Sequence, residues 1–154
     1  METLRIESNQ EVSKILVEGV PDRPGIAAEI FGALGAQGFN VELVVTTGGT
    51  GGLADICLAV SREESRNVQS ALSELRKAVS ARTVREDVGI ALVSVVGSNL
   101  SKVPGVAGRM FHALSSRGIN IDVVSTSLSS VTCMIPADRT EEAVVALEGE
   151  FLSG

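Results

Sequence analysis

The residues best suited to bind a small charged molecule lie in a proline-bearing loop that runs into an apolar helical pattern. The stretch GVPDRPGIAAEIF, from Gly19 to Phe31, places Asp22 just before Pro24 and Gly25. A helix that begins there leaves its first N–H groups unpaired and points its positive dipole end at the loop, which suits a carboxylate. Asp22 suits an ammonium group. The loop therefore predicts a site for an amino-acid zwitterion, with an ordinary turn and helix cap as the alternative.

The same loop-to-helix junction occurs twice, because the chain contains an internal repeat. Residues 24–47, PGIAAEIFGALGAQGFNVELVVTT, align without a gap with residues 104–127, PGVAGRMFHALSSRGINIDVVSTS. Each copy predicts a β-branched strand, the loop, a helix with apolar residues three and four apart, two strands and a second helix.

This order predicts an α+β fold of two ferredoxin-like βαββαβ modules in tandem, residues 1–82 and 83–154. Copy one closes with a short strand in RTVRED, whereas copy two has no counterpart after its second helix. The N-terminal LRIES, Leu4–Ser8, precedes the first long strand much as TVRED precedes the second. We therefore expect the N-terminal strand to complete the second module, so that the two modules interlock.

Composition disfavours several classes of function. The net charge of −6 argues against a nucleic-acid or anionic-membrane surface, both of which need basic patches. The first residues lack a signal-peptide pattern and no apolar run could span a bilayer, so a cytoplasmic location is expected. Cys57 and Cys133 are predicted to be buried thiols at equivalent strand positions, and His112 a helix-surface residue. We expect no catalytic residue, metal site or cofactor.

A glycine-rich stretch, TTGGTGGLAD, contains the spacing G-x-G-x-x-A at Gly49, Gly51 and Ala54. A dinucleotide-binding loop must open a helix, but the residues that follow have the pattern of a strand. We therefore interpret this stretch as a hairpin connection.

Together these motifs resemble tandem ACT domains, in particular the regulatory region, or β subunit, of aspartate kinase. The VPDRPG loop and the second-copy runs VSVVG, PGVAGRMF and GINIDVVSTS carry the resemblance, which covers roughly residues 5–151. It implies a regulatory protein without catalytic activity that binds an amino-acid effector, threonine or lysine, at interfaces between paired modules. It also implies a homodimer and a partner in the form of an aspartate kinase catalytic domain or subunit. The implied effector-binding positions are Asp22, Pro24, Gly25, Ile26, Ala27, Asn40, Val41, Glu42, Thr46, Val106, Ala107, Asn120, Ile121 and Ser127.

Two departures from the family pattern leave a second function open. The family usually carries Gln at the position of Thr46, and it continues with EIKIS where this chain has LSSVT, Leu128 to Thr132. A protein-interaction subunit with an altered or vestigial effector pocket would account for both. An enzyme is disfavoured, because the sequence offers no nucleophile with an acid–base pair, no metal set and no phosphate loop.

Overall fold

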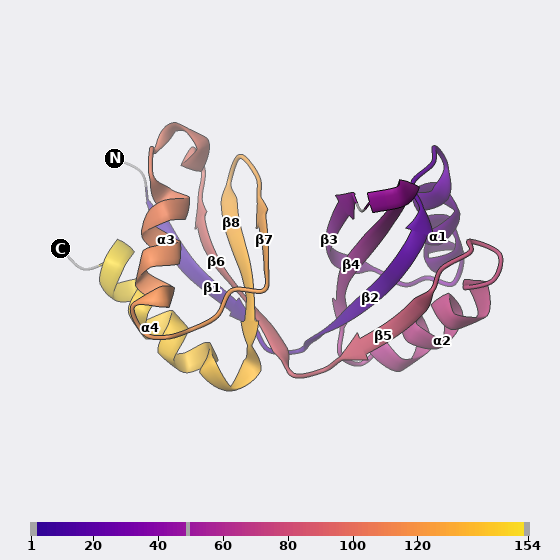
Figure 1. Ribbon diagram of the computed structural model, residues 1–154. Coiled ribbons are helices and arrows are strands. Elements are labelled where there is room, and N and C mark those ends of the chain that lie inside the picture. Colours follow the sequence, from indigo (N-terminus) through magenta and orange to yellow (C-terminus); the bar gives the residue numbers. More distant parts are fainter. Residues whose placement is uncertain (1–2, 49, 153–154) are drawn as a thin grey trace. The chain divides into compact units, whose positions relative to one another are not determined.

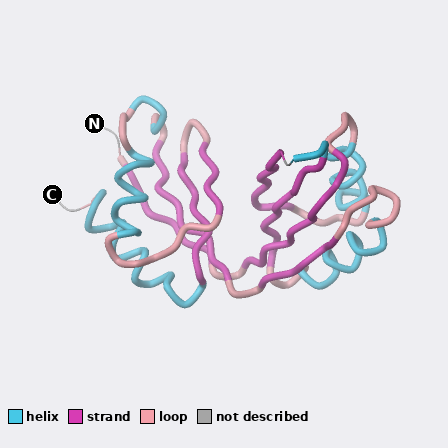
Figure 2. Tube along the Cα trace, viewed as in Figure 1, coloured by secondary structure: helices cyan, strands magenta, loops and turns pink. Residues whose placement is uncertain are grey.

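The computed structural model describes residues 3–48 and 50–152 and divides them into two modules (Figures 1 and 2). The first module contains β2 (Val12–Pro21), α1 (Ile26–Ala36), β3 (Val41–Gly48), β4 (Leu53–Ser61), α2 (Ser65–Leu75) and β5 (Thr83–Asp87). The second contains β1 (Leu4–Asn9), β6 (Ile90–Gly97), α3 (Val106–Ser115), β7 (Val123–Thr126), β8 (Ser130–Pro136) and α4 (Thr140–Phe151). The short 3₁₀ helices are η1 (Thr50–Gly52), η2 (Leu100–Lys102) and η3 (Ala137–Arg139).

Each module has one four-stranded antiparallel sheet, ordered β3-β4-β2-β5 in the first and β1-β6-β8-β7 in the second. The predicted interlocking is confirmed, because the N-terminal strand β1 completes the second sheet. Ile6 pairs with Val95 of β6, just as Val84 of β5 pairs with Val17 of β2. The two modules thus have the same predicted ferredoxin-like topology, although their fourth strands come from different parts of the chain.

The compact units differ from the division at residue 82. One unit comprises residues 11–88, and the other combines residues 1–10 with residues 89–154. Residues 83–87 belong to the first unit because β5 pairs with β2 and Glu86 accepts a hydrogen bond from Ser65 of α2. The N-terminal residues belong to the second because Leu4 and Ile6 pack against its core.

The helices α1 and α2 cover one face of the first sheet, and α3 and α4 cover one face of the second (Figure 1). The predicted apolar spacing of α1 is confirmed, since Ile26, Ile30 and Leu34 are all buried. The repeat-equivalent residues of α3 are buried too, and they are Val106, Met110 and Leu114. Burial of each such side chain contributes about 1.5–3 kcal/mol, so these stripes dock the two helices in the same register on their sheets.

Both cysteines are buried free thiols, as predicted, but they do not occupy equivalent positions. Cys133 pairs with Val93 and lies in the helix-covered core, where its repeat equivalent is Leu58. Cys57 pairs with Leu16 on the opposite face of its sheet. A shift of one residue along a strand reverses the face, because side chains alternate with period two.

The glycine-rich stretch is a connection between β3 and β4, as interpreted. Gly51 and Gly52 have φ values of +72° and +76°, and strand β4 follows directly where a dinucleotide-binding loop would need a helix. Gly49 lies outside the described residues. His112 is exposed on α3, as predicted. Among the described residues, no helix is long and apolar enough to cross a membrane.

Candidate functional site

Each proline-bearing loop enters its helix through a glycine in the left-handed conformation. Gly25 has φ +92° before α1, and Gly105 has φ +80° before α3. Neither helix has a side chain that caps its N-terminus. Asp22 therefore does not cap α1 through its side chain, and the loop is a turn that leaves this carboxylate exposed.

This entry leaves backbone donors free at the start of both helices. In α1, the N–H of Glu29 donates to the carbonyl oxygen of Gly25 at 3.0 Å, and the equivalent bond in α3 joins Arg109 to Gly105 at 3.0 Å. Within the described part of the chain, the N–H groups of Ala27 and Ala107 have no backbone acceptor. Unpaired N–H groups at the positive end of a helix dipole form a binding site for an anion.

In the second module, a cavity of about 380 Å³ opens at the start of α3. It unites three predicted positions, because Val106 and Ala107 of the helix line it together with Ser127 beyond β7. Thr126, the repeat equivalent of Thr46, lines it as well, and no charged residue does. The lining residues are Leu100, Ser101, Val103, Pro104, Gly105, Val106, Ala107, Thr126, Ser127 and Val131.

The first module places the equivalent residues at one end of its sheet. Val20 of β2 and Gly48 of β3 both pair with Ala54 of β4, so the loop that follows β2 and the last residues of β3 are neighbours. Asp22 and Thr46 are both exposed at this end. We call the residues at this end, Asp22 to Ala27 and Thr46, the loop group of the first module.

The other predicted positions lie at the opposite end of each module. Asn40 precedes β3 and follows the end of α1, and Asn120 has the same place after α3. The helix α1 has 11 residues and is therefore about 16 Å long. Asn40, Val41 and Glu42, which we call the strand-start group, are separated from the loop group by that length.

Several predicted positions present only backbone to a ligand. The side chains of Ile26 and Val106 are buried in the two cores. Those of Val41 and Ile121 are half-buried and pack against the same cores. The exposed side chains that remain for polar contacts are Asp22, Asn40, Glu42, Thr46, Asn120 and Ser127.

Sequence reasoning missed a charged cluster on β2 and β5 of the first module. The guanidinium of Arg85 lies 2.8 Å from the carboxylate of Glu18, and the hydroxyl of Thr83 donates to the same oxygen at 2.8 Å. The Thr83 hydrogen bond, aided by the charge of Arg85 and opposed by desolvation, lowers the pKa of Glu18 below its ordinary value. The signal was present in the repeat, because β2 has Glu18 where β6 has Val96.

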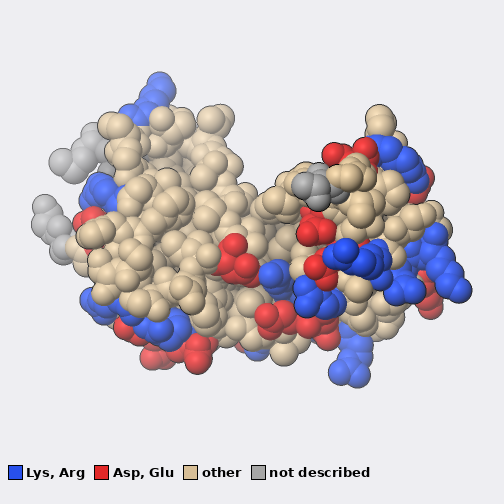
Figure 3. Space-filling model, in the orientation of Figure 1, with Lys and Arg blue, Asp and Glu red and all other residues tan. Residues whose placement is uncertain are grey.

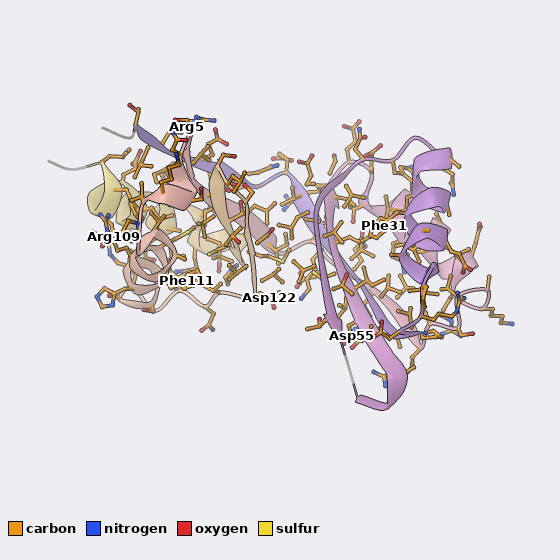
Figure 4. The ribbon with its side chains drawn as sticks, turned by 90° about the horizontal axis from the view of Figure 1, so that it is seen from above. Arg5, Phe31, Asp55, Arg109, Phe111 and Asp122 are labelled. Atoms are coloured by element: carbon orange, nitrogen blue, oxygen red, sulfur yellow. The ribbon has the colours of Figure 1, made fainter. Side chains whose placement is uncertain are left out.

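Two further side chains, Asp55 and Arg109, fix the ends of the modules. The carboxylate of Asp55, labelled in Figure 4, accepts the N–H of Gly19 at 2.9 Å and so holds the end of β2 to β4. Arg109 of α3 lies over the ring of Phe151 at 4.6 Å and donates to the carbonyl of Glu150 at 2.9 Å. These two contacts of Arg109 tie α3 to the end of α4.

The arrangement offers binding groups rather than reactive ones. Among residues 3–48 and 50–152, no three or more His, Cys, Asp or Glu side chains are grouped as metal ligands. Burial raises the pKa of the Cys133 thiol to about 12, which suppresses the nucleophilic thiolate. Free backbone donors, hydroxyls and an exposed carboxylate recognise small polar molecules without reacting with them.

Family models of the ACT domain match residues 14–80 and 93–151. The chain belongs to the ACT-domain family. The first module is therefore one ACT domain and the second module another, in the tandem arrangement that the repeat predicts.

This pair of ACT domains is similar in sequence and structure to parts of aspartate kinases. An aspartate kinase of Pseudomonas putida is 36% identical over 146 residues, which are 95% of this chain and 36% of that protein. A crystal structure of aspartokinase alpha and beta subunits is 30% identical, with a TM-score of 0.90 over 99% of this chain and 100% of that one. The ligand-free regulatory subunit of aspartate kinase from Thermus thermophilus is 29% identical, with a TM-score of 0.90 over 97% and 98%.

The chain thus spans about a third of the length of the curated relative, 36%, but 98% of the solved regulatory subunit from Thermus thermophilus. Its two ACT domains resemble the regulatory part of aspartate kinase.

Proposed function

We propose that these two ACT domains form the effector-binding regulatory part of an aspartate kinase, and that an amino acid bound to them controls a catalytic domain or subunit. The observation that carries the proposal is that the helices after Gly25 and Gly105 both start without a side-chain cap. The N–H groups of Ala27 and Ala107 can therefore donate hydrogen bonds to a carboxylate. Asp22, at the same end of the first ACT domain, supplies the anionic partner that an α-ammonium group requires.

The geometry further supports a site shared by two copies of the chain. Asn40 and Asp22 lie at opposite ends of one ACT domain, too far apart for both to contact one small amino acid. If two β3 strands pair antiparallel across a two-fold axis, the strand-start group of one copy meets the loop group of the other. We therefore propose a homodimer in which each effector contacts both copies.

The sheet edges agree with such pairing. Val44 of β3 is 43% exposed and its repeat equivalent Val124 of β7 is 37% exposed, and each lies on an edge strand. The opposite edge strands, β1 and β5, carry more charged side chains, which makes them less suited to pair with the same edge of a second copy. The edges β3 and β7, where Glu42 is the one charged residue, are thus the better candidates for contact between copies.

For the effector we propose lysine or threonine. A solved structure of E. coli aspartokinase III, 25% identical with a TM-score of 0.69, is described as a complex with lysine and aspartate. In this chain the loop group offers Asp22 to a cationic ligand. The cavity of the second ACT domain has hydroxyl and apolar walls, which favour threonine there.

A thermal-shift screen against the proteinogenic amino acids at millimolar concentration tests the proposal. An effector that binds only the folded protein stabilises it by an amount that grows with the logarithm of the ratio of its concentration to its Kd, and Tm rises accordingly. Asp22→Ala should remove the shift for a ligand of the first ACT domain. Glu29→Ala is the matched control, because its exposed carboxylate lies 3.4 Å from Arg23 on the same loop and helix. No shift with any amino acid, or an unchanged shift in Asp22→Ala, would contradict the assigned site.

A second candidate function is an interaction subunit whose effector pocket has changed. Thr46 replaces the family's usual Gln, and Leu128, beside the second cavity, is 76% exposed. This candidate predicts copurification with a catalytic partner at the same yield with and without amino acids. A yield that changes with lysine or threonine would favour the first proposal.

A further inference from the structure

One part of the first ACT domain is basic although the chain as a whole is acidic. Between Leu75 and Arg85 the sequence LRKAVSARTVR carries four basic residues and no acidic one, in a chain of net charge −6. In the second ACT domain, the last turn of α4 instead carries Glu148 and Glu150. The end of the second helix is therefore basic in the first domain and acidic in the second.

The segment borders a cavity with a volume of about 650 Å³. Its wall combines the end of α2 with one edge of β5, and three of its residues are cationic and one is acidic. The lining residues are Ser73, Glu74, Arg76, Lys77, Thr83, Val84 and Arg85. We call this cavity the α2–β5 groove. Figure 3 shows Lys and Arg side chains gathered near β5, beside a patch of acidic ones.

The groove runs along a free strand edge. β5 is the last strand in the order β3-β4-β2-β5 and pairs only with β2, from Thr83 opposite Glu18 to Asp87 opposite Lys14. Among the described residues, its other edge has no strand partner. A free edge presents backbone N–H and C=O groups that an extended peptide can pair with.

The charges along this edge are graded. Arg76 and Lys77 are exposed at the α2 end, and Arg76 donates to the carbonyl of Arg82 at 3.1 Å, which fixes the loop between α2 and β5. Arg85 is 64% exposed even though it contacts Glu18. Glu86 and Asp87 then make the far end of β5 acidic. The edge thus attracts carboxylates at its Thr83 end and repels them at its Asp87 end.

We propose that the α2–β5 groove binds an acidic, extended segment of a partner protein, which adds to β5 as a fifth strand. Backbone hydrogen bonds to the free edge hold the segment, and Arg76, Lys77 and Arg85 pair with its carboxylates. This site lies on the opposite edge of the sheet from β3, so it works independently of the proposed effector site and of the homodimer.

Fluorescence anisotropy with three labelled peptides tests the proposal on the full chain. The first peptide alternates valine and glutamate, the second replaces each glutamate by glutamine, and the third keeps the glutamates but is N-methylated at alternate residues. We expect the glutamine peptide to bind at least about tenfold more weakly than the first, because it lacks the carboxylates. We expect the N-methylated peptide to bind at least about tenfold more weakly as well, because it lacks backbone N–H donors. Amide exchange should slow at β5 when the first peptide binds.

A charge-reversal variant and a matched control locate the site. The double variant Arg76→Glu/Lys77→Glu should weaken binding of the acidic peptide by at least about tenfold. Arg66→Glu also changes an exposed arginine of α2, but this residue does not line the groove, so it should leave binding within about twofold. Circular dichroism verifies that each variant is folded.

Three results would overturn the proposal. Equal binding of the N-methylated peptide would exclude strand addition, and displacement by pyrophosphate without protection of β5 would show a site for small anions only. A dimer that forms through β5 and excludes the peptide would show that a second copy of the chain occupies the edge.

Discussion

The two ACT domains share one scaffold but complete it in different ways. The first obtains its fourth strand, β5, from the residues that follow α2, whereas the second obtains it from the N-terminus as β1. The registers match residue for residue, since Ile6 opposite Val95 repeats Val84 opposite Val17. The comparison teaches that the sheet requires a strand with apolar side chains on its core face at this place, but not a particular connection to it.

The strongest test of this comparison removes β1. Deletion of residues 1–9 should unfold the second ACT domain, because it exposes a central strand, β6, and removes Leu4 and Ile6 from the core. We expect a loss of more than about 5 kcal/mol, comparable with the whole stability of a small domain. Amide exchange should show unprotected β6 and β8 beside protected β2 and β4.

The control for the deletion is Arg5→Ala/Glu7→Ala. These two side chains form a 2.7 Å ion pair on the surface of β1 and contribute nothing to the core. Exposed pairs are worth about 0–1 kcal/mol, so this variant should leave both domains folded. Retained protection of β6 after the deletion would show that the second domain does not depend on β1.

A core substitution in each domain asks whether the two units unfold separately. Ile30 and Met110 are fully buried at equivalent positions of α1 and α3. Truncation of either to alanine should cost about 2–5 kcal/mol. Urea titrations with amide exchange as the readout should show the loss of unfolding free energy in β2 and β4 for Ile30→Ala. For Met110→Ala they should show it in β6 and β8. An equal loss in both domains from either variant would mean that the units unfold as one.

Much of this fold could be predicted because the sequence repeats. Ile30 and Leu34 keep helical spacing, the loops align, and the missing fourth strand of copy two pointed to the N-terminus. The equivalence of Cys57 and Cys133 was wrong by one residue, since loops of different length precede β4 and β8 and a single strand pattern does not fix their register.

The site was harder to predict than the fold. The sequence located Asp22 and Ala27 at a helix start, but the left-handed Gly25 and the absence of a side-chain cap became visible only in the backbone. Nor did spacing reveal that Asn40 lies a helix length away from Asp22. The cluster of Glu18, Thr83 and Arg85 joins residues distant in sequence, and only the pairing of β2 with β5 brings them together.

Smaller effects distinguish the helix entries from the helix interiors. Gly25→Ala and Gly105→Ala each force a residue with a Cβ into the left-handed region, although nothing lies within 4 Å of either Cβ. Each should therefore cost about 1–2 kcal/mol from backbone strain alone. Gly32 is the control, because it is inside α1 with equally open space. Gly32→Ala should stabilise by up to about 1 kcal/mol. Thermal denaturation should show a lower Tm for Gly25→Ala and Gly105→Ala and a higher Tm for Gly32→Ala.

The smallest expected difference between the domains is their response to acid. Hydrogen bonding from Thr83, together with the charge of Arg85, lowers the pKa of Glu18 in the folded state below its ordinary value of 4.5. A lowered pKa means that the unfolded chain binds a proton first, so this contribution to stability is complete above pH 4.5 and disappears as the pH falls through the lowered pKa. Val96 occupies the equivalent position in the second domain and cannot titrate.

Urea titrations at a series of pH values below 5, with amide exchange as the readout, test this difference. We expect the pairing of β2 with β5 to weaken with acid more than the pairing of β6 with β1. Glu18→Gln keeps the shape of the side chain and removes its titration. In this variant, acid should therefore weaken the pairing of β2 with β5 no more than the pairing of β6 with β1. An unchanged pH slope in Glu18→Gln would assign the acid sensitivity to other carboxylates. The charged cluster would then be a contact that the first domain tolerates rather than one that stabilises it.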